Sequence, residues 1–273
     1  MSINWGVGLH TPIAGCFNES AYEQYIGRWS RLFVPAVLAA AETCTGDRIL
    51  DVATGSGEAA TMALTTVGDS GLVIGADISS AMLATACARL SDRPFCAVVT
   101  DGQALAFRDA SFDGVLCQLG LMFFPDPSQG LAEFRRVLRP GRCAAVCVIS
   151  SCDRAPMWGI LAEALCRCLP DQATMLHLSF SLANASRLKS MFSAAGFRDI
   201  RVSKETREAV VDSFDEYWAP IEAGTGLMPQ AYLALPEASR RAVREEVYAR
   251  LAKFACNGRY NMSVEMLVGA GRA

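Results

Sequence analysis

The order of short apolar runs and helical patterns in the first 150 residues restricts this chain to a narrow group of folds. Nearly continuous apolar runs are typical of strands that are buried on both faces of a sheet. Five such runs are predicted as strands, at 48–53, 72–76, 95–100, 112–118 and 142–149. The segments between them predict helices over 58–67, 79–90 and 126–138. Strands and helices in this alternation form right-handed crossovers and a parallel sheet.

After residue 150 the pattern becomes mainly helical. Helices are predicted over 156–169, 184–195, 214–223 and 237–254, and two further strands over 197–204 and 260–269. We therefore predict an α/β fold with a doubly wound, Rossmann-like, seven-stranded and mostly parallel sheet and a helical cap. As one domain, the chain divides into N-terminal lid helices at 15–45, a cofactor-binding core at 46–150, cap insertions at 151–195 and 206–258, and last strands at 196–205 and 259–270.

Composition limits the class of protein and of partner. Apolar residues make up 52% and charged residues 19% of 273, which excludes a disordered, coiled-coil or fibrous chain. The net charge of −3 has no long run of one sign, so neither a nucleic acid nor a membrane surface is an expected partner. A small-molecule partner fits better. The oligomeric state is left open between monomer and homodimer.

The eleven cysteines predict free thiols rather than a disulfide framework. Their number is odd, and a chain of this length does not need covalent cross-links, so a reducing compartment is expected. Cys96, Cys117, Cys143 and Cys147 lie in apolar runs, where cysteine acts as a small hydrophobe. The amino end lacks the basic and apolar regions of a secretory signal, which makes a cytoplasmic location the expectation.

The loop after the first predicted strand carries the main chemical signal. Gly55 to Ala60 fits G-x-G-x-x-A, a pattern that binds dinucleotides at a helix N-terminus, and Asp77 lies 20 residues after Gly57. Asp51, inside the strand just before this loop, would repel a pyrophosphate but suits a cationic ligand. S-adenosylmethionine (SAM) carries a sulfonium and an ammonium and has no phosphate.

The segment Ile49–Gly57, with the sequence Ile-Leu-Asp-Val-Ala-Thr-Gly-Ser-Gly, resembles motif I of the class I SAM-dependent methyltransferases. Three later segments resemble that family's further motifs in the same order: Gly75–Ser79 with Met82, Thr100–Phe107 running into Ser111–Asp113, and Glu133–Gly141. In two places the chain departs from the family pattern. Ala53 replaces the first glycine of the loop, and Arg142 replaces the second glycine of a Pro-Gly-Gly turn.

The resemblance implies a SAM site with assigned roles. Asp77 would accept hydrogen bonds from both ribose hydroxyls, and the alternative is that it is a helix N-cap. Asp101 would accept a hydrogen bond from the adenine amine, and the alternative is that it is a turn residue. Ile78 and Met82 would pack on the adenine, although a pair at this spacing is as often plain core. The predicted cofactor-binding residues are Tyr25, Arg28, Asp51, Ala53, Thr54, Gly55, Gly57, Asp77, Ile78, Met82, Asp101, Gly102, Gln103, Gln118 and Leu119.

Tyr22, Tyr25 and Trp29 lie on one stripe of a predicted N-terminal helix. This stripe resembles the lid helices of small-molecule methyltransferases, which implies that Arg28 or Tyr25 lies near the methionine carboxylate. A simple packing helix is the alternative.

Few residues are available to activate an acceptor. His10 and His177 are the only histidines, and His177, in the predicted cap, is the best-placed general base if the acceptor is a hydroxyl; the alternative is a structural histidine. There is no metal-ligand motif, and a thiol site for arsenite built from Cys44, Cys166 and Cys168 has no fixed geometry. We therefore predict in-line methyl transfer that depends mainly on alignment and desolvation.

The resemblance also limits the classes of acceptor that are expected. Methyltransferases acting on nucleobase or amide nitrogens carry an Asn/Asp-Pro-Pro-Tyr/Phe motif, whereas this chain has Cys117-Gln118-Leu119-Gly120. Quinone C-methyltransferases share the Asp-Val-Ala-Thr-Gly opening, but their His-Arg segment near the N-terminus is missing, so quinone methylation is a secondary option. The sequence predicts methyl transfer from SAM to O, N or C of a small molecule.

Two alternatives stay open. An NAD-dependent oxidoreductase is disfavoured by Asp51 and by the lack of a Tyr-x-x-x-Lys pair. A SAM-binding protein without catalysis is not excluded by any residue.

Overall fold

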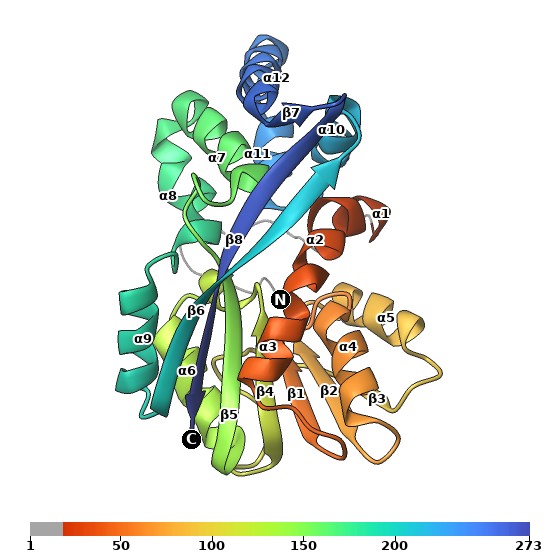
Figure 1. Cartoon of the computed structure of the whole chain (residues 1–273), viewed down its shortest axis with the longest axis vertical. Helices are drawn as coiled ribbons and strands as arrows, with labels where there is room; N and C mark the ends of the chain where they lie inside the picture. Colours follow the sequence, from red (N-terminus) through yellow and green to blue (C-terminus); the bar gives the residue numbers. More distant parts are fainter. Residues whose placement is uncertain (1–18) are drawn as a thin grey trace.

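A twisted sheet with helices on both faces forms one half of the molecule, and a helical cap forms the other (Figure 1). The computed structural model describes residues 19–273. The strand order is β3-β2-β1-β4-β5-β8-β6, and β7 pairs with β8. The strands are β1 (Arg48–Val52), β2 (Leu72–Asp77), β3 (Phe95–Val99), β4 (Phe112–Gln118), β5 (Leu138–Ile149), β6 (Arg198–Val211), β7 (Ala255–Cys256) and β8 (Arg259–Arg272).

The pairing confirms the predicted doubly wound sheet. Strands β1 to β5 are parallel to one another, and β8 is antiparallel to both β5 and β6. The prediction of seven strands missed β7, which makes eight. It has only two residues, so it has no apolar run that a sequence pattern could detect.

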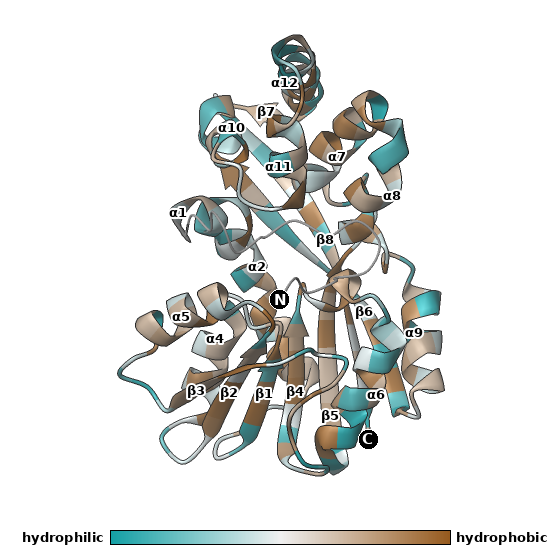
Figure 2. Cartoon of the chain, turned by 180° about the vertical axis from the view of Figure 1, so that it is seen from behind, coloured by the Kyte–Doolittle hydropathy of each residue, from teal (hydrophilic) through white to brown (hydrophobic). Residues whose placement is uncertain are grey.

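Helices cover the two faces of the sheet separately (Figures 1 and 2). On one face lie α3 (Val34–Ala40), α4 (Glu58–Val67) and α5 (Ser80–Arg89), and on the other lie α6 (Pro127–Val137) and α9 (Ala185–Ala194). Helix α6 begins as the sequence predicts, because the Asp126 side chain accepts hydrogen bonds from the Ser128 and Gln129 amides. Helix α9 packs closely on β8, where a side chain on Gly269 would meet Leu188 at 3.0 Å.

A run of short helical turns precedes α3, and we call residues 19–33 the lid. It consists of α1 (Glu19–Tyr22), η2 (Glu23–Gly27), α2 (Arg28–Ser30) and η3 (Arg31–Phe33). The predicted lid began at residue 15, and positions 15–18, like His10 and Cys16, lie outside the described residues. The lid occupies the level between the sheet and the cap (Figure 1).

The cap is built around a central buried helix. It contains α7 (Pro156–Cys168), α8 (Ala173–Leu176), α10 (Phe214–Glu222), α11 (Leu227–Leu233) and α12 (Glu237–Leu251), with short turns η5 (Pro170–Gln172), η6 (Leu178–Phe180) and η7 (Ala252–Phe254). Nearly all of α7 from Pro156 to Leu165 is buried. Helix α12 packs on it through a single stripe, Val243, Val247 and Leu251, while most of its other residues are hydrophilic (Figure 2).

Two predicted cap boundaries need correction. Strand β6 runs to Val211 instead of ending near 205, because it pairs with the long β8 as far as Tyr260. Helix α9 was assigned to the cap but packs on β6, β8 and α6, at the level of the sheet. The cap segments are therefore 151–183 and 212–258, and β6 and β8 carry the sheet into the cap.

One cysteine differs from the prediction in its exposure to solvent. Cys117, Cys143 and Cys147 are buried, as expected, whereas Cys96 is exposed. The reason is that β3 is an edge strand of the sheet, so part of it faces solvent. All ten cysteines among residues 19–273 are free.

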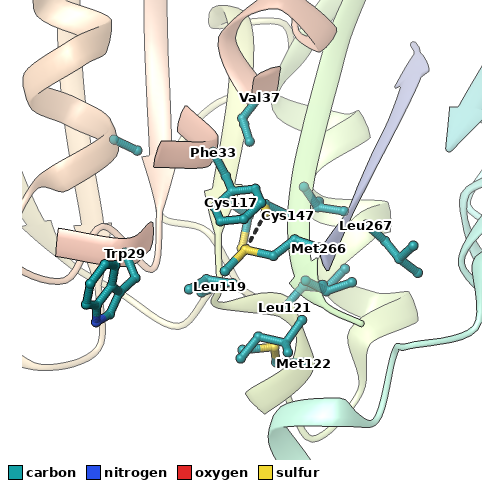
Figure 3. Packing of buried hydrophobic residues seen from close by; sticks show 14 of the residues in the cluster. Trp29, Phe33, Val37, Cys117, Leu119, Leu121, Met122, Cys147, Met266 and Leu267 are labelled. Carbon is teal, nitrogen blue, oxygen red and sulfur yellow. Dashed lines mark hydrogen bonds between the residues drawn. The ribbon is translucent and has the colours of Figure 1, made fainter. Parts of the chain in front are cut away.

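The core beneath the lid joins the sheet to the lid and to α3 (Figure 3). Phe33 and Val37 pack over Cys117 of β4 and Cys147 of β5, and the Cys147 sulfur lies 3.5 Å from that of Met266. This packing holds the lid against the carboxyl ends of β4 and β5. In the described part of the chain, no helix has the length and apolar character needed to span a membrane.

Candidate functional site

The loop from β1 to α4 turns through three residues with left-handed backbone. Ala53, Gly55 and Gly57 have φ of 56°, 56° and 86°. Glycine adopts this conformation freely, but alanine does so at a cost of about 1–2 kcal/mol. The sequence showed a small residue at position 53; the structure shows that it is strained. Its methyl group also fixes Gly120 opposite, where a side chain would come within 2.4 Å of the Ala53 Cβ.

Two carboxyl groups hold this loop in place. The Thr54 hydroxyl donates to Asp51 Oδ2 at 2.6 Å, and the Gly55 amide donates to Asp77 Oδ2 at 2.9 Å. The other oxygen of Asp77 accepts from the Ser79 amide at 2.8 Å. The second oxygen of Asp51 is buried and has no partner among the described residues. The sequence-predicted Asp51, Thr54, Gly55 and Asp77 thus form one hydrogen-bonded unit at the carboxyl ends of β1 and β2.

Burial controls the charge of both carboxyl groups. It raises the pKa of Asp51 to about 7, against the lowering effect of the Thr54 hydroxyl and the Ala60 amide. Burial also raises the pKa of Asp77, although three backbone amides oppose the shift. The negative charge of Asp77 contributes to the shift at Asp51. Two neighbouring acids, one buried and one half-buried, favour a ligand that brings positive charge.

The lid places Tyr22 over this unit. A side-chain carbon on Gly55 would lie 3.5 Å from the Tyr22 hydroxyl oxygen and 3.3 Å from the Met82 methyl carbon. Burial, and then the charge of Asp77, raise the pKa of Tyr22. The sequence analysis did not include Tyr22 among the cofactor-binding residues. The signal that could have identified it is its place as the first residue of the aromatic stripe.

Tyr25 and Arg28 face the cap instead of the loop. Arg28 donates to Glu216 Oε1 of α10 at 2.6 Å, and the Tyr25 carbonyl accepts from the Trp158 indole of α7 at 3.1 Å. The structure therefore does not bring these two residues to the loop, because their side of the lid is turned toward α7 and α10.

A charged cluster that sequence reasoning missed ties the lid to the loop helices. Arg31 of the lid pairs with Glu23 and, at 3.1 Å, with Glu58 at the start of α4; Arg89 at the end of α5 also pairs with Glu58. Burial and the adjacent Glu58 raise the pKa of Glu23. These residues are far apart in the sequence, so no local pattern joined them.

The loop after β3 lies beside Asp77, whose carbonyl accepts from the Thr100 amide at 3.0 Å. Asp101 is exposed and accepts from the Gln103 amide at 2.8 Å, while Gln103 Oε1 accepts from the Asp126 amide at 2.7 Å. Gly102 has a phenylalanine ring behind it: a side chain there would come within 2.3 Å of Phe124. Their contact with adenine stays a prediction, as does that of the partly exposed Ile78 and Met82.

The end of β4 meets the lid directly. Gln118 Nε2 donates to the Ser30 carbonyl at 3.0 Å, and the Leu119 amide donates to the Cys147 carbonyl at 2.9 Å. Leu119 has a φ of 54°, a second non-glycine residue in left-handed backbone near this site. The lid therefore covers the end of β4, where the sequence predicts that the methyl group of SAM lies next to the acceptor.

His177 makes its contacts within the cap. Its Nδ1 lies 3.0 Å from the Ala173 carbonyl oxygen and 3.4 Å from the Cys166 sulfur, and its ring lies against Phe180. Its role as a base stays a prediction. In residues 19–273 there is no cluster of three or more side chains suited to a metal.

Comparison with known proteins agrees with this geometry. A family model described as a methyltransferase domain matches residues 50–145. The chain is 32% identical to the ubiquinone/menaquinone biosynthesis C-methyltransferase UbiE of Xylella fastidiosa over 63% of this chain and 73% of that protein. The chain belongs to the class I SAM-dependent methyltransferases.

A second relative and a solved structure extend the comparison. The methyltransferase is 38% identical to a demethylmenaquinone methyltransferase of Renibacterium salmoninarum, over 52% of this chain and 56% of that protein. The match thus spans little more than half of that relative. The fold is similar to that of a phosphoethanolamine N-methyltransferase of Haemonchus contortus in complex with SAM, with a TM-score of 0.59, 18% identity, and coverage of 97% of this chain and 58% of that one.

Proposed function

We propose that this methyltransferase transfers the methyl group of SAM to O, N or C of a small-molecule acceptor. The observation that carries the proposal is the unit of Asp51, Thr54, Gly55 and Asp77, in which the buried Asp51 and the half-buried Asp77 hold a glycine loop. A ligand with a sulfonium, an ammonium and a ribose complements that charge. The pyrophosphate of NAD would face two carboxylates at the same place.

The residues present fit SAM at the atomic level. Asp51 Oδ1 is buried without a partner, which leaves an acceptor for a cationic donor. The Gly55 and Ser79 amides donate to different oxygens of Asp77, so its carboxylate retains acceptor capacity for a ribose hydroxyl. We propose Tyr22, above Gly55, as a further contact with SAM.

The chain's own contribution is alignment and exclusion of water. When bound, SAM supplies an activated methyl group, whose bond to sulfur breaks as the acceptor's electron pair bonds to carbon and any displaced proton passes to water. The Gln118–Ser30 hydrogen bond holds the lid over the end of β4. His177 is engaged within the cap, which supports transfer without a protein base.

The experiment uses the whole chain with SAM labelled in its methyl group. A panel of acceptors includes a reduced demethylmenaquinone, since relatives are named for that substrate, together with phenols and primary amines. We expect acceptor-dependent formation of S-adenosylhomocysteine and of a labelled product. SAM binding without turnover on any acceptor would support the non-catalytic alternative. In a parallel reaction with NAD in place of SAM, oxidation of a panel compound with reduction of NAD to NADH would support the oxidoreductase.

We also propose a cytoplasmic location and a monomer or homodimer that binds no nucleic acid. The ten free cysteines of the described chain and the net charge of −3 support this part of the proposal.

A further inference from the structure

Four charged side chains form a closed ring between the lid and the two helices beside the β1–α4 loop. Glu23 and Arg31 belong to the lid, whereas Glu58 begins α4 and Arg89 ends α5. Glu23 pairs with Arg31, and Arg31 Nε lies 3.1 Å from Glu58 Oε2. Glu58 pairs with Arg89, and Arg89 Nη2 lies 3.8 Å from Glu23 Oε2. Each charge thus has a neighbour of opposite sign on both sides. We call these four residues the charge ring.

The arginines of the charge ring hold two carboxylates that would otherwise repel each other. Burial and then the charge of Glu58 raise the pKa of Glu23, while Arg31 and Arg89 oppose the shift. The Glu58 side chain is only 12% exposed, so solvent screens it less than a surface charge. Isolated exposed ion pairs contribute little to stability, whereas networks contribute more. Loss of one arginine would therefore remove attraction and also release repulsion between the lid and α4.

The lid backbone leaves room for this arrangement at Gly27. Residues Glu23–Gly27 form one π-helical turn, a conformation that recurs at functional sites. The Glu23 side chain folds back over this turn, and a side-chain carbon on Gly27 would lie 3.1 Å from the Glu23 carboxyl carbon and closer still to one of its oxygens. Gly27 has a φ of −54°, which any residue adopts. The space that the Glu23 carboxylate occupies, and not the backbone conformation, therefore explains this glycine.

The charge ring lies where the lid covers the loop. Glu58 directly follows Gly57, the last residue of the loop. Tyr22 precedes Glu23 and stands over Gly55, where a side-chain carbon would lie 3.5 Å from the tyrosine hydroxyl oxygen. In both views α1 and α2 stand above α4 and α5 (Figures 1 and 2). SAM bound on the loop would lie beneath Tyr22, so it can enter and leave only when the lid moves away from α4.

We propose that the charge ring is an electrostatic latch, which holds the lid closed over the β1–α4 loop and sets the rates at which SAM enters and S-adenosylhomocysteine leaves. Arg31 is then a positioning residue, because it acts through the lid and not through contact with the ligand. This inference rests on the proposed function, because it requires SAM to bind beneath Tyr22.

The test measures how fast tritium-labelled S-adenosylhomocysteine binds to and leaves the whole chain, by rapid filtration, together with its dissociation constant at equilibrium. Arg31→Gln removes two links of the charge ring. We expect its association and dissociation rates both to rise roughly 2- to 30-fold, the range for two exposed ion pairs. Every link of the ring lies within the protein, so the ring favours the closed lid with or without a ligand. The dissociation constant should therefore change by less than about threefold.

Two further measurements separate charge from shape at Arg31. Arg31→Lys keeps the charge and should restore most of the native behaviour. Sodium chloride at about 0.5 M should quicken exchange in the native chain more than in Arg31→Gln, because salt screens the charge ring.

Gly27→Ala tests the latch without removing a charge. The new methyl group takes the space of the Glu23 carboxylate, so exchange should quicken, whereas the melting temperature should stay unchanged or rise because alanine favours a helix. Arg167→Gln is the matched control. It removes a similarly exposed arginine from an ion pair with Glu246 in the cap, and it should leave both rates at their native values.

Native exchange rates in Arg31→Gln would overturn the latch. Faster dissociation with an equal loss of affinity and an unchanged association rate would also overturn it, because that pattern indicates a lost contact with the ligand. Failure of the native chain to bind S-adenosylhomocysteine would overturn the proposed function, and the latch with it.

Discussion

The cofactor half and the cap half of this molecule are assembled in different ways. In the cofactor half, backbone amides and two carboxyl groups within residues 51–79 are joined by hydrogen bonds and form the candidate site. In the cap half, side chains between residues 25 and 220 come together from the lid, α7, β6 and α10. The first arrangement depends on local backbone geometry, and the second depends on how distant segments pack.

This difference indicates a division of labour. A site made of backbone groups and strand ends suits a ligand that is the same in every member of a family. A site made of side chains on a cap can change its ligand by substitution while the sheet stays intact. Changes in the cofactor half should therefore affect SAM strongly, whereas changes in the cap should have smaller effects on the chemistry.

The largest effect is expected for Asp77→Asn. The change removes the charge that would accept two ribose hydroxyls, and loss of a charged hydrogen bond costs about 1.5–3 kcal/mol, or roughly 10- to 150-fold in SAM affinity. The structure indicates an additional loss of about 1–3 kcal/mol of stability, because the asparagine NH₂ group would face the amide of either Gly55 or Ser79.

Calorimetry measures the SAM affinity of Asp77→Asn, and thermal unfolding measures its stability. Asp69→Asn serves as a control, since Asp69 is an exposed carboxyl in the turn before β2. An unaltered dissociation constant for SAM in Asp77→Asn would place Asp77 outside the site.

The next effect concerns pH and Asp51, whose pKa burial raises to about 7. Below pH 7 this carboxyl is protonated in the free protein, and cationic SAM favours its ionised form. We expect SAM affinity to fall as the pH drops below about 7, by up to about tenfold per pH unit. The free protein behaves oppositely: the folded state retains a proton that the unfolded state loses, so this group's contribution to stability declines as the pH rises from about 4 to 7.

Asp51→Asn separates this group from other titrations. The variant keeps an oxygen for the Thr54 hydroxyl but cannot ionise, so its SAM affinity should be weak and nearly constant between pH 6 and 8. Calorimetric titrations across that range check this. The same slope in the native chain and in Asp51→Asn would assign the pH dependence to another group.

The smallest effect on the chemical step is expected for His177→Ala. General-base catalysis contributes about 10² to 10⁴ in rate, whereas alignment and desolvation alone would leave the step within about tenfold. The contacts of His177 with Ala173 and Cys166 support the smaller value. Single-turnover methyl transfer at saturating SAM measures it, and a drop beyond a hundredfold with the fold intact would make His177 the base.

The sheet and its glycine loop could be predicted because their signals are local. The span 58–67 is found unchanged as helix α4, and 112–118 as strand β4, since each segment carries its own apolar pattern. The upper end of β6 was missed because Glu205–Glu208 is polar; this segment is a strand only through its pairing with β8. The residues of this segment do not by themselves indicate that it pairs with β8.

The candidate site could be predicted only where one motif contains it. Asp51 and Asp77 accept hydrogen bonds from the loop itself and lie within the motifs that carry the resemblance, so the sequence alone identified them as candidates. The orientation of the lid is a tertiary property. It places Tyr22 over Gly55 and turns Tyr25 and Arg28 to the cap, and helical spacing alone could not choose between these faces.

Titration calorimetry of the native chain with SAM, and separately with NAD, tests the central claim most directly. If Asp51, Thr54, Gly55 and Asp77 form a site for a cationic nucleoside, SAM and S-adenosylhomocysteine should both bind, and NAD should give no heat of binding at the same concentrations. SAM should bind more tightly at pH 8 than at pH 6. Micromolar binding of NAD with no heat from SAM would contradict the account.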